Sequence, residues 1–376
     1  MQKIICRELF TGNEFIEDAF VVFEDRIIDL GRGRGEQYSC DTTEVGFVMP
    51  GFVDSHTHAV FAGSRERELE MKLEGKRYME ILKAGYGINR TVEDTKRESD
   101  DEILRESEAR IERAIEHGTT TMEVKTGYGI TMEQELRLLG IIEKLKRRLE
   151  DRIDIIPTFL AHIKPYEGYT DELIEHMDAV AGRAEFFDVF MEAFGYDDTE
   201  RLLRKAKSLG FGLKLHTDEF SDCGGVALAR RLGCVSVDHL IRSPVDSFKS
   251  VEAQPVPCLL PATSFSSFEP YARGAEIAAL GAPVALATDM NPNCWCESMG
   301  FVADLACYCM RMKPMDVLKG MTLNGARALS LKDRGQIAKG AMADIVITTA
   351  KNHADFFSKF GTKKVERLIK KGKVVI

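Results

Sequence analysis

The chain has 376 residues, of which 44% are hydrophobic, and a formal net charge of −9 at pH 7. This length and composition suit an ordinary folded protein with one large domain and room for a small second one. The negative charge would repel nucleic acid and anionic membranes, and no apolar run reaches the ~18 residues of a spanning helix, so neither partner is expected.

Both ends of the chain predict short β-strands, which together indicate one small domain. Residues 1–47 contain the runs IICREL and AFVVFEDRIIDLG, and residues 335–376 contain GQIAKGAMADIVIT and VERLIKKGKVVI. We expect these segments to pair as a small β-sandwich domain that carries both termini. The first residues, MQKIICRELF, lack the charged and apolar regions of a signal peptide, so a cytoplasmic location is expected.

Residues 48–334 alternate apolar β-rich runs with charged amphipathic runs, a pattern typical of βα units. Helical runs such as DEILRESEARIERAIEH, EQELRLLGIIEKLKRRL and TERLLRKAKSLG lie between the strand candidates. Together these units predict an α/β fold, a (β/α)8 TIM barrel. An open doubly wound sheet is the second interpretation, weakened because no Gly-rich phosphate loop follows the first strand. The eight strand candidates are residues 48–58, 119–127, 153–162, 185–192, 212–219, 235–240, 256–263 and 283–289.

Histidines and one aspartate mark the carboxyl ends of three of these strands. Side chains alternate across a strand with period two, so His56 and His58 in FVDSHTH share one face. The same alternation points His216 of GLKLHTDE inward with Lys214, and Asp289 of PVALATD inward above small alanines. Barrel enzymes place their active sites at this end. Three imidazoles and a carboxylate suit Zn²⁺ or Fe²⁺, with an open position for water.

The distribution of the histidines supports one shared site. Five of the eight lie at strand carboxyl ends, which chance placement rarely gives: His56, His58, His162, His216 and His239. The other three are assigned no function, because His117 closes a helix before a glycine while His176 and His353 lie in polar runs.

Neither the cysteines nor the basic residues near the C-terminus are expected to form a binding site. The nine cysteines are odd in number and scattered, which favours reduced thiols over a disulfide framework. Cys294 with Cys296, and Cys307 with Cys309, form C-x-C pairs that we interpret as buried free thiols, because neither has the C-x2-C spacing of a zinc knuckle. The run KKVERLIKKGK has the alternation of an edge strand whose lysines face solvent.

Several motifs resemble the amidohydrolase superfamily over nearly the whole chain. They are PGFVDSHTH, the HTDE, DHL and ATD segments, and the closing pattern G-x-I-x-x-G-x-x-A-D-I-V-I. Within that superfamily the chain is most similar to the imidazolonepropionase family, through HTHAVFAGSRERE (56–68), EVKTGYG (123–129), HTDE (216–219) and TDMNPN (288–293). The resemblance implies metal-dependent hydrolysis of the ring C–N bond of 4-imidazolone-5-propanoate to N-formimidoyl-L-glutamate, a step of histidine degradation.

The resemblance also implies roles for individual residues. Arg65 would bind the substrate's propionate, because guanidinium pairs bidentately with carboxylate. The catalytic residues would be Asp289, which shuttles a proton, His239, which orients the attacking water, and Glu219, which bonds a ring nitrogen. One ion per subunit, Zn²⁺ or iron (Fe²⁺ or Fe³⁺), would be held by His56, His58, His216 and Asp289. The substrate pocket would comprise Arg65, Tyr128, His162, Glu219, Asn291, Asn293 and Cys294.

Two pairs of positions matter here, one for the metal count and the other for the pocket. Binuclear members of the superfamily bridge two metals with a carboxylated lysine on strand four, where this chain has Glu192, while Lys125 lies on strand two. A single metal is therefore expected, with Glu192 as a second-site ligand the alternative. After Asn291, the family has Gly and then Ser or Thr where this chain has Asn293 and Cys294.

Two other functions are alternatives. An aminohydrolase that deaminates a purine or pyrimidine shares the H-x-H pair, the strand-five and strand-six histidines and the strand-eight Asp, but its uncharged substrate has no need of Arg65. A non-catalytic scaffold on an amidohydrolase fold is the remote alternative, weakened because every ligand position is filled. The superfamily resemblance implies a homodimer that acts on a small molecule.

Overall fold

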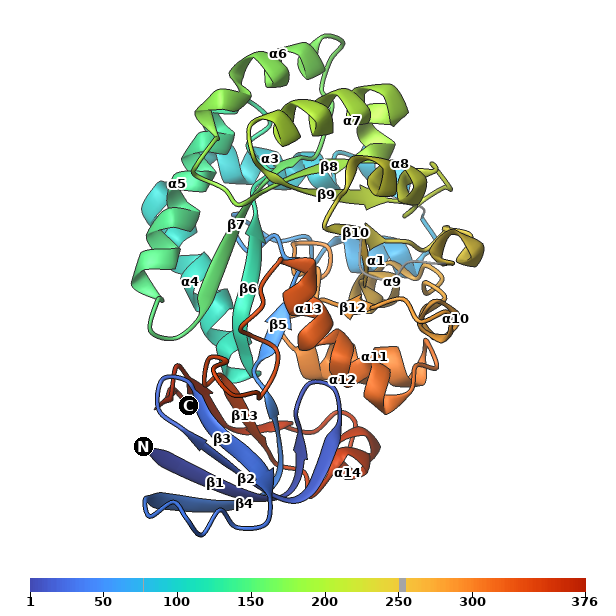
Figure 1. Ribbon diagram of the computed structural model, residues 1–376. Coiled ribbons are helices and arrows are strands. Elements are labelled where there is room, and N and C mark those ends of the chain that lie inside the picture. The colour runs from blue at the N-terminus through green and yellow to red at the C-terminus, as the bar shows by residue number, and fades with distance from the viewer. Residues whose placement is uncertain (77, 250–254) are drawn as a thin grey trace.

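The computed structural model describes residues 1–76, 78–249 and 255–376. Within this part of the chain the strands form two sheets, one of eight strands and one of seven. The eight-stranded sheet lies above the seven-stranded one, and both ends of the chain lie at the latter (Figure 1). The expected α/β barrel with a separate sheet from the termini is confirmed.

The seven-stranded sheet, which we call the terminal sheet, is built from both ends of the chain. Its order is β15-β14-β13-β4-β1-β2-β3; β1 pairs in parallel with β4, and the other neighbouring pairs are antiparallel. A buried apolar cluster that includes Ile4, Val21, Ile345 and Ile369 joins the N-terminal and C-terminal strands. The strands are β1 (Gln2–Phe10), β2 (Phe15–Phe23), β3 (Ile27–Arg32), β4 (Asp41–Pro50), β13 (Ile345–Thr348), β14 (Val365–Lys370) and β15 (Lys373–Val374).

The eight-stranded sheet is the wall of the barrel. Its order, β12-β11-β10-β9-β8-β7-β6-β5, follows the chain, and neighbouring strands are parallel. The strands are β5 (Phe52–Asp54), β6 (Thr119–Lys125), β7 (Asp154–Ala161), β8 (Phe186–Phe190), β9 (Gly212–Thr217), β10 (Ser236–His239), β11 (Val256–Leu259) and β12 (Ala285–Leu286).

The ring of strands closes just beyond the ends of β5 and β12. A parallel bridge joins Thr57 to Met290. The His58 N–H donates to the Met290 carbonyl oxygen at 2.8 Å, and the Asp289 N–H donates to the His56 carbonyl oxygen at 3.0 Å. The seam of the barrel is therefore made by the segments that carry three of the predicted metal ligands.

The first predicted strand, 48–58, is divided between the two sheets, which corrects the sequence expectation. Residues 48–50 finish β4 in the terminal sheet, and the barrel begins with the short β5. Gly51 lies at the crossing, where an added Cβ would come within 2.3 Å of the Thr120 hydroxyl oxygen. Only glycine allows the backbone so close to its neighbour, so the crossing point is fixed by that residue.

The last two predicted barrel strands are also shorter than expected. The run 256–263 ends with β11, because Pro261 begins helix α9 (Pro261–Ser267) and proline is favoured in the first turn of a helix. In the run 283–289, β12 covers only two residues. The remaining residues of that run form the irregular segment that carries Asp289.

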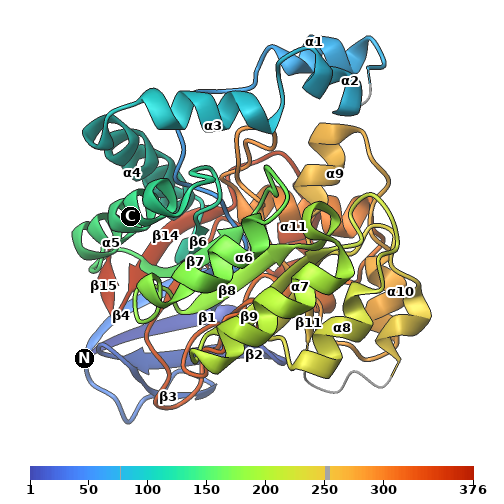
Figure 2. The same ribbon diagram turned by 90° about the horizontal axis from the view of Figure 1, so that it is seen from above.

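Helices cover the outer face of the barrel, as Figure 2 shows from above. The three amphipathic runs quoted above become α4 (Asp100–Glu116), α5 (Met132–Arg148) and α7 (Met191–Ser208). Ser99 and Thr131 cap α4 and α5, because their side chains accept the N–H three residues on. None of the described helices is long and apolar enough to cross a membrane. The others are α6 (Tyr169–His176), α8 (Gly225–Leu232), α10 (Gly274–Ala279), α11 (Met299–Tyr308), α12 (Pro314–Gly320), α13 (Leu323–Ala328) and α14 (His353–Ser358), with 3₁₀ turns at Met177–Ala179 and Val245–Phe248.

Three further helices, α1 (Glu68–Leu73), α2 (Tyr78–Lys83) and α3 (Ile88–Arg97), lie between β5 and α4 in the chain. In Figure 2 they run along one side of the molecule, with α1 and α2 near α9. Lys72 on α1 donates hydrogen bonds to the Ser266 carbonyl oxygen (3.2 Å) and to Asn293 Oδ1 (2.6 Å). These bonds fix the segment against the carboxyl ends of the barrel strands.

The basic run near the C-terminus is partly buried, which corrects the prediction of a solvent-facing edge strand. β14 lies between β13 and β15 and is not the edge of the sheet. Lys370 is fully buried and pairs with Asp154 at the start of β7 and with Asp344, while Lys364 pairs with Asp304 on α11. Buried ammonium groups need such partners, so these lysines join the terminal sheet to the barrel.

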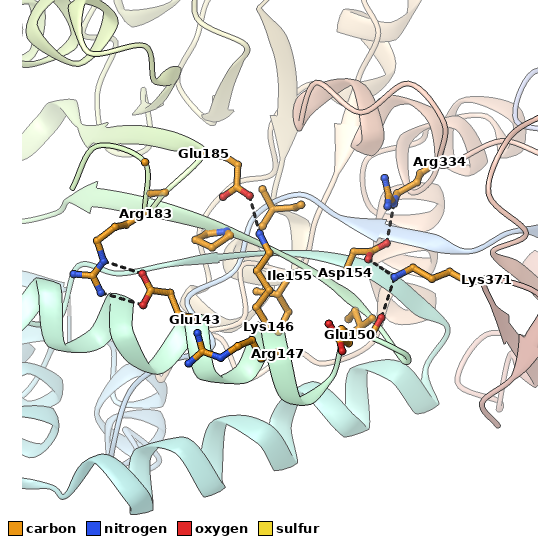
Figure 3. Close-up of a pocket in the computed structure, with 15 residues that line it drawn as sticks. Glu143, Lys146, Arg147, Glu150, Asp154, Ile155, Arg183, Glu185, Arg334 and Lys371 are labelled. Atoms are coloured by element: carbon orange, nitrogen blue, oxygen red, sulfur yellow. Dashed lines mark hydrogen bonds and ion pairs between the residues drawn. The ribbon is translucent and has the colours of Figure 1, made fainter. Parts of the chain in front are cut away.

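A groove of about 780 Å³ lies beside this joint. Figure 3 shows Arg334 and Lys371 turned toward Asp154, and Arg183 turned toward Glu143. Because these charges pair with one another across the groove, we interpret it as a structural junction between the two sheets.

Candidate active site

The four predicted metal ligands lie together at the carboxyl ends of the barrel strands. His56 and His58 follow β5, His216 lies on β9, and Asp289 follows β12. Asp289 Oδ1 is 3.5 Å from His56 Nε2 and 3.3 Å from His58 Nε2. The ring centroids of His56 and His216 are 4.4 Å apart. All four side chains are buried, and the ring centroid of His216 lies 5.6 Å from that of His58.

Several buried polar atoms of this cluster lack a hydrogen-bond partner within the described residues: His56 Nε2, His58 Nδ1, His216 Nε2, His239 Nδ1 and Asp289 Oδ1. Native proteins rarely leave such atoms unpaired. Ligand atoms of His56, His58 and Asp289 lie within 4.8 Å of one another, and so do those of His56, His216 and His239. Imidazole nitrogens and a carboxylate at this spacing fit a divalent metal ion such as zinc or iron.

His239, which the sequence places near the attacking water, is as close to the cluster as the predicted ligands are. Its ring centroid lies 5.2 Å from that of His216 and 5.5 Å from that of His56. The backbone φ angle is +79° at His239 and +49° at Asp289, in the left-handed region that non-glycine residues seldom adopt. Strain of this kind is found at functional sites, where the surrounding structure holds it in place.

Two buried aspartates orient the predicted ligands from below. Asp238 Oδ2 lies 2.6 Å from His56 Nδ1, and Asp188 Oδ2 lies 3.0 Å from His216 Nδ1, the latter with poorer hydrogen-bond alignment. The contact with Asp238 leaves Nε2 of His56 facing Asp289, and Nε2 of His216 has no hydrogen-bond partner within the described residues. The sequence pattern predicts neither aspartate as part of the site; the local signal is a single carboxylate on the inner face of an apolar strand, as in FFDVF of β8.

Protonation states in the cluster favour metal binding. Burial lowers the pKa of His56 and of His58 below the usual value, and it lowers the pKa of His239 to about 3. Burial alone would raise the pKa of Asp289, but its interactions with His58, His239 and the Thr263 hydroxyl outweigh that effect and lower the pKa. The imidazoles of His56, His58 and His239 are therefore neutral and Asp289 is ionised near neutral pH, which are the forms that bind metal.

A cavity of about 360 Å³ opens beside the cluster. Leu82, Ile88 and Phe190 supply apolar walls, and the first two come from α2 and α3. Our reading of the sequence did not single these out, because an apolar side chain beside a site has the same pattern as a core residue. Apolar walls with a few convergent polar groups are typical of small-molecule sites. The predicted site residues that line the cavity are His58, His216, His239, Asp289, Arg65, Tyr128, His162, Glu219, Asn291 and Asn293.

Arg65 already has a carboxylate partner in this structure. Its Nε and Nη2 donate to the two carboxylate oxygens of Glu68, at 2.7 Å each. Glu68 is fully buried and also accepts the N–H of Gly87 at 2.7 Å. The Nη1 side of the guanidinium makes no hydrogen bond to the described residues, so that edge is the one that can meet a ligand.

The loop after β12 is organised by its own side chains. Asn291 Oδ1 accepts the N–H groups of Asn293 (2.7 Å) and Cys294 (3.0 Å). Cys294 is buried and does not line the cavity; its Sγ donates to the Thr288 carbonyl oxygen at 3.6 Å. All nine cysteines are free thiols, although Cys309 is exposed, which corrects the expectation that both C-x-C pairs are buried.

Glu192 and Lys125 have structural partners. Glu192 Oε1 accepts the N–H groups of Glu219 (2.7 Å) and Phe220 (3.3 Å), so it fixes the loop after β9. Lys125 lies inside the barrel, with Nζ 2.6 Å from Asp188 Oδ2. Among the described residues, the clusters with metal-ligand spacing do not include Glu192.

The chain is similar to known proteins over most of its length. The chain matches the Amidohydrolase family over residues 47–375. An imidazolonepropionase from Pyrobaculum arsenaticum is 39% identical over 371 residues, which cover 95% of this chain and 92% of that protein. Another, from Halobacterium salinarum, is 41% identical over 349 residues, which cover 88% of this chain and 82% of that protein.

Solved structures resemble the whole chain. A 5-methylcytosine deaminase from Klebsiella pneumoniae, with 5-fluorocytosine as ligand, has a TM-score of 0.80 at 19% identity and covers 100% of this chain and 97% of its own. A triazine hydrolase variant has a TM-score of 0.79 at 14% identity, with 100% and 94% covered. At these identities the likeness shows the fold alone.

Proposed function

Because this chain belongs to the amidohydrolase family, we propose that it opens the ring of 4-imidazolone-5-propanoate by hydrolysis and releases N-formimidoyl-L-glutamate, the imidazolonepropionase reaction of histidine degradation. Identity to imidazolonepropionases extends over nearly the whole chain. The observation that carries the substrate is Arg65, whose guanidinium lines the same cavity as His58 and Asp289. A cation beside a metal centre suits a small ring with a carboxylate arm.

One metal ion, zinc or iron, belongs to this proposal, with His56, His58, His216 and Asp289 as its ligands. The unpaired Nε2 atoms and Asp289 Oδ1 support this assignment. Such a metal lowers the pKa of a water molecule toward about 7 and so supplies a nucleophile at neutral pH. A single ion is favoured because Glu192, the alternative second ligand, accepts backbone N–H groups through Oε1 and belongs to none of the clusters with metal-ligand spacing among the described residues.

The pocket side chains would position the substrate between Arg65 and the metal ligands. The free Nη1 edge of Arg65 meets the propionate, while Tyr128 and His162 lie beside the ring of His58, with centroids 6.0 Å and 5.5 Å away. Burial and the charge of Asp289 raise the pKa of Glu219 well above its usual value. A protonated Glu219 can donate a hydrogen bond to a ring nitrogen of the substrate.

Asp289 is the group best placed to move the proton. Its Oδ2 accepts a hydrogen bond from the Thr263 hydroxyl, and its Oδ1 faces His56 and His58. In the proposed reaction Asp289 takes the proton of the attacking water and returns it to the ring nitrogen that leaves. His239, on the neighbouring side of the cluster, orients the water.

The deaminase alternative is less well supported. The deaminase structure shares the fold at 19% identity, whereas the imidazolonepropionases are about twice as similar. An uncharged base also has no use for the Arg65 cation. The scaffold alternative is weaker still, because the ligand positions are filled and their buried atoms face one point.

The direct test is to supply 4-imidazolone-5-propanoate with and without chelator and follow the ring absorbance. Loss of absorbance that stops with chelator and returns with Zn²⁺ or Fe²⁺ is expected. No metal-dependent turnover, or deamination of guanine or cytosine instead, would refute the proposal. The family resemblance also supports a homodimer, which light scattering of the purified protein would test.

A further inference from the structure

Five ionisable side chains fill the barrel interior directly below the predicted metal ligands. They project from β6, β8, β9 and β10, every one of them is fully buried, and we call them the buried charge cluster: Glu123, Lys125, Asp188, Lys214 and Asp238. Lys125 Nζ lies 2.7 Å from Glu123 Oε2, 2.6 Å from Asp188 Oδ2 and 3.9 Å from Asp238 Oδ2. Lys214 Nζ lies 2.8 Å from Glu123 Oε2 and 3.7 Å from Asp238 Oδ2.

Stability alone does not account for such a cluster. Removing charges from water carries a large desolvation penalty, and well-packed apolar side chains of similar volume are often as stable or more so. The lower interior of this same barrel does use apolar packing, through residues such as Val53, Ile156 and Val235. Charges appear where the interior meets the ligands, since Asp238 and Asp188 face Nδ1 of His56 and His216.

We propose that Asp188 and Asp238 are positioning residues for the metal, which hold His216 and His56 with Nδ1 protonated and Nε2 directed at the ion, and that Lys125 keeps both carboxylates in place. The inference rests on the proposed metal centre. A carboxylate partner fixes the tautomer and ring orientation of a metal-binding histidine. Ser236 adds to this, because its hydroxyl donates to Asp238 Oδ1 at 2.7 Å and fixes the other carboxylate oxygen.

Lys125 is the member that connects the two aspartates. Its ammonium contacts Asp188 directly and lies within ion-pair distance of Asp238, whereas Lys214 pairs with Glu123 and Asp238 only.

The test measures Co²⁺ binding to the chelator-treated protein by competition with a chromophoric chelator, together with the visible absorption spectrum of the Co²⁺ form. Asp188→Asn and Asp238→Asn should each lower Co²⁺ affinity about 10- to 100-fold, because the asparagine amide donates to Nδ1 and moves the ring proton to Nε2. Lys125→Met should also lower it, since Asp188 loses its ion pair at 2.6 Å and Asp238 loses one at 3.9 Å. The Co²⁺ spectrum should change in each case.

The matched control is Asp304→Asn, which breaks another buried ion pair, with Lys364 at 2.9 Å, far from the metal. It should lower the melting temperature while Co²⁺ affinity stays within twofold of wild type. If the cluster variants fail to fold, Ser236→Ala removes a single bond to Asp238 and should still weaken Co²⁺ binding. Co²⁺ affinity unchanged in the cluster variants, or lowered as much by Asp304→Asn, would overturn the inference. Co²⁺ binding is measured without substrate. The inference can therefore hold even if the proposed reaction is wrong, and the two failures are distinguishable.

Discussion

Glu68 holds Arg65 by the Nε–Nη2 side of its guanidinium, with both N···O distances at 2.7 Å. The pair is nearly inaccessible to solvent, since the side chains are 8% and 1% exposed. A guanidinium has two edges that can bind a carboxylate, and Glu68 occupies one of them. The arginine is thereby held in one orientation, and its Nη1 makes no hydrogen bond to the described residues.

Replacing Arg65 should weaken substrate binding more than it slows chemistry. A charge-assisted hydrogen bond contributes about 1.5–3 kcal/mol, so Arg65→Met should lower kcat/KM by roughly 10- to 150-fold, mostly through KM. The double variant Arg65→Met with Glu68→Met removes the unpaired carboxylate and should show the same change. An imidazolone that lacks the propionate arm should be turned over equally by both proteins and by wild type. Loss of activity toward that truncated compound would argue for a role of Arg65 in the chemistry.

Thr263 should influence proton transfer through Asp289. Its hydroxyl donates to Asp289 Oδ2, and both side chains are buried. Thr263→Val leaves that oxygen unpaired and the carboxylate free to turn, so kcat should fall about tenfold or more with little change in KM. Thr263→Ser keeps the hydroxyl and should retain most of kcat. Steady-state kinetics of the two variants provide the comparison, and equal kcat values would contradict the role assigned to the hydroxyl.

Acid should weaken the joint between the barrel and the terminal sheet. Burial alone would raise the pKa of Asp154, but Lys370 and Arg334 outweigh that effect and lower it from 3.8 to about 2. A lowered carboxyl pKa contributes stability that is complete above pH 4 and disappears as the pH falls through 2, here about 2 kcal/mol. Asp154→Asn should lose this amount and show a shallower decline between pH 4 and pH 2.

Urea unfolding of the metal-free protein at several pH values measures that contribution. Asp151→Asn is the control, because Asp151 is exposed and forms a long ion pair with Lys373, at 3.6 Å. Exposed pairs contribute less than about 1 kcal/mol. Equal losses of unfolding free energy in the two variants would mean that the ion pairs of Asp154 stabilise the protein no more than an exposed pair does.

Metal binding should raise the thermal stability of the protein. An ion that binds only the folded chain stabilises it by about 2.7 kcal/mol at 100 times its dissociation constant. Adding Zn²⁺ to chelator-treated protein should therefore raise the melting temperature in scanning fluorimetry. His216→Ala should lose most of the shift, whereas His176→Ala, an exposed histidine on α6, should keep it. A full shift in His216→Ala would place the ion elsewhere.

The sequence pattern was most informative about which face of a strand carries each side chain. Period two placed His56, His58 and His216 on inner faces, and the strand count placed them at one end of a barrel, where the structure brings them together. The same rule could not show that Asp238 would meet His56, because alternation gives a direction and no partner. Such pairings depend on the register between strands far apart in the chain.

Some differences between the predicted and the observed structure have a local cause in the sequence. Pro261 is a sequence signal for the helix that shortens the seventh strand, although the apolar run before it looked continuous. Lys370 shows the opposite case. A lysine in a basic C-terminal run is predicted to face solvent. Its burial is explained by its ion pairs with Asp154 on β7 and with Asp344. Long-range charge pairing of this kind has no local pattern.

The seam at Thr57 and Met290 has a consequence for when the site can exist during folding. The two residues are bridged, but 232 residues separate them in the chain, so forming the seam requires a long loop to close. A nascent chain that ends before β12 would carry the histidine ligands without Asp289. The proposed four-ligand metal site would therefore be complete only after the ring has closed.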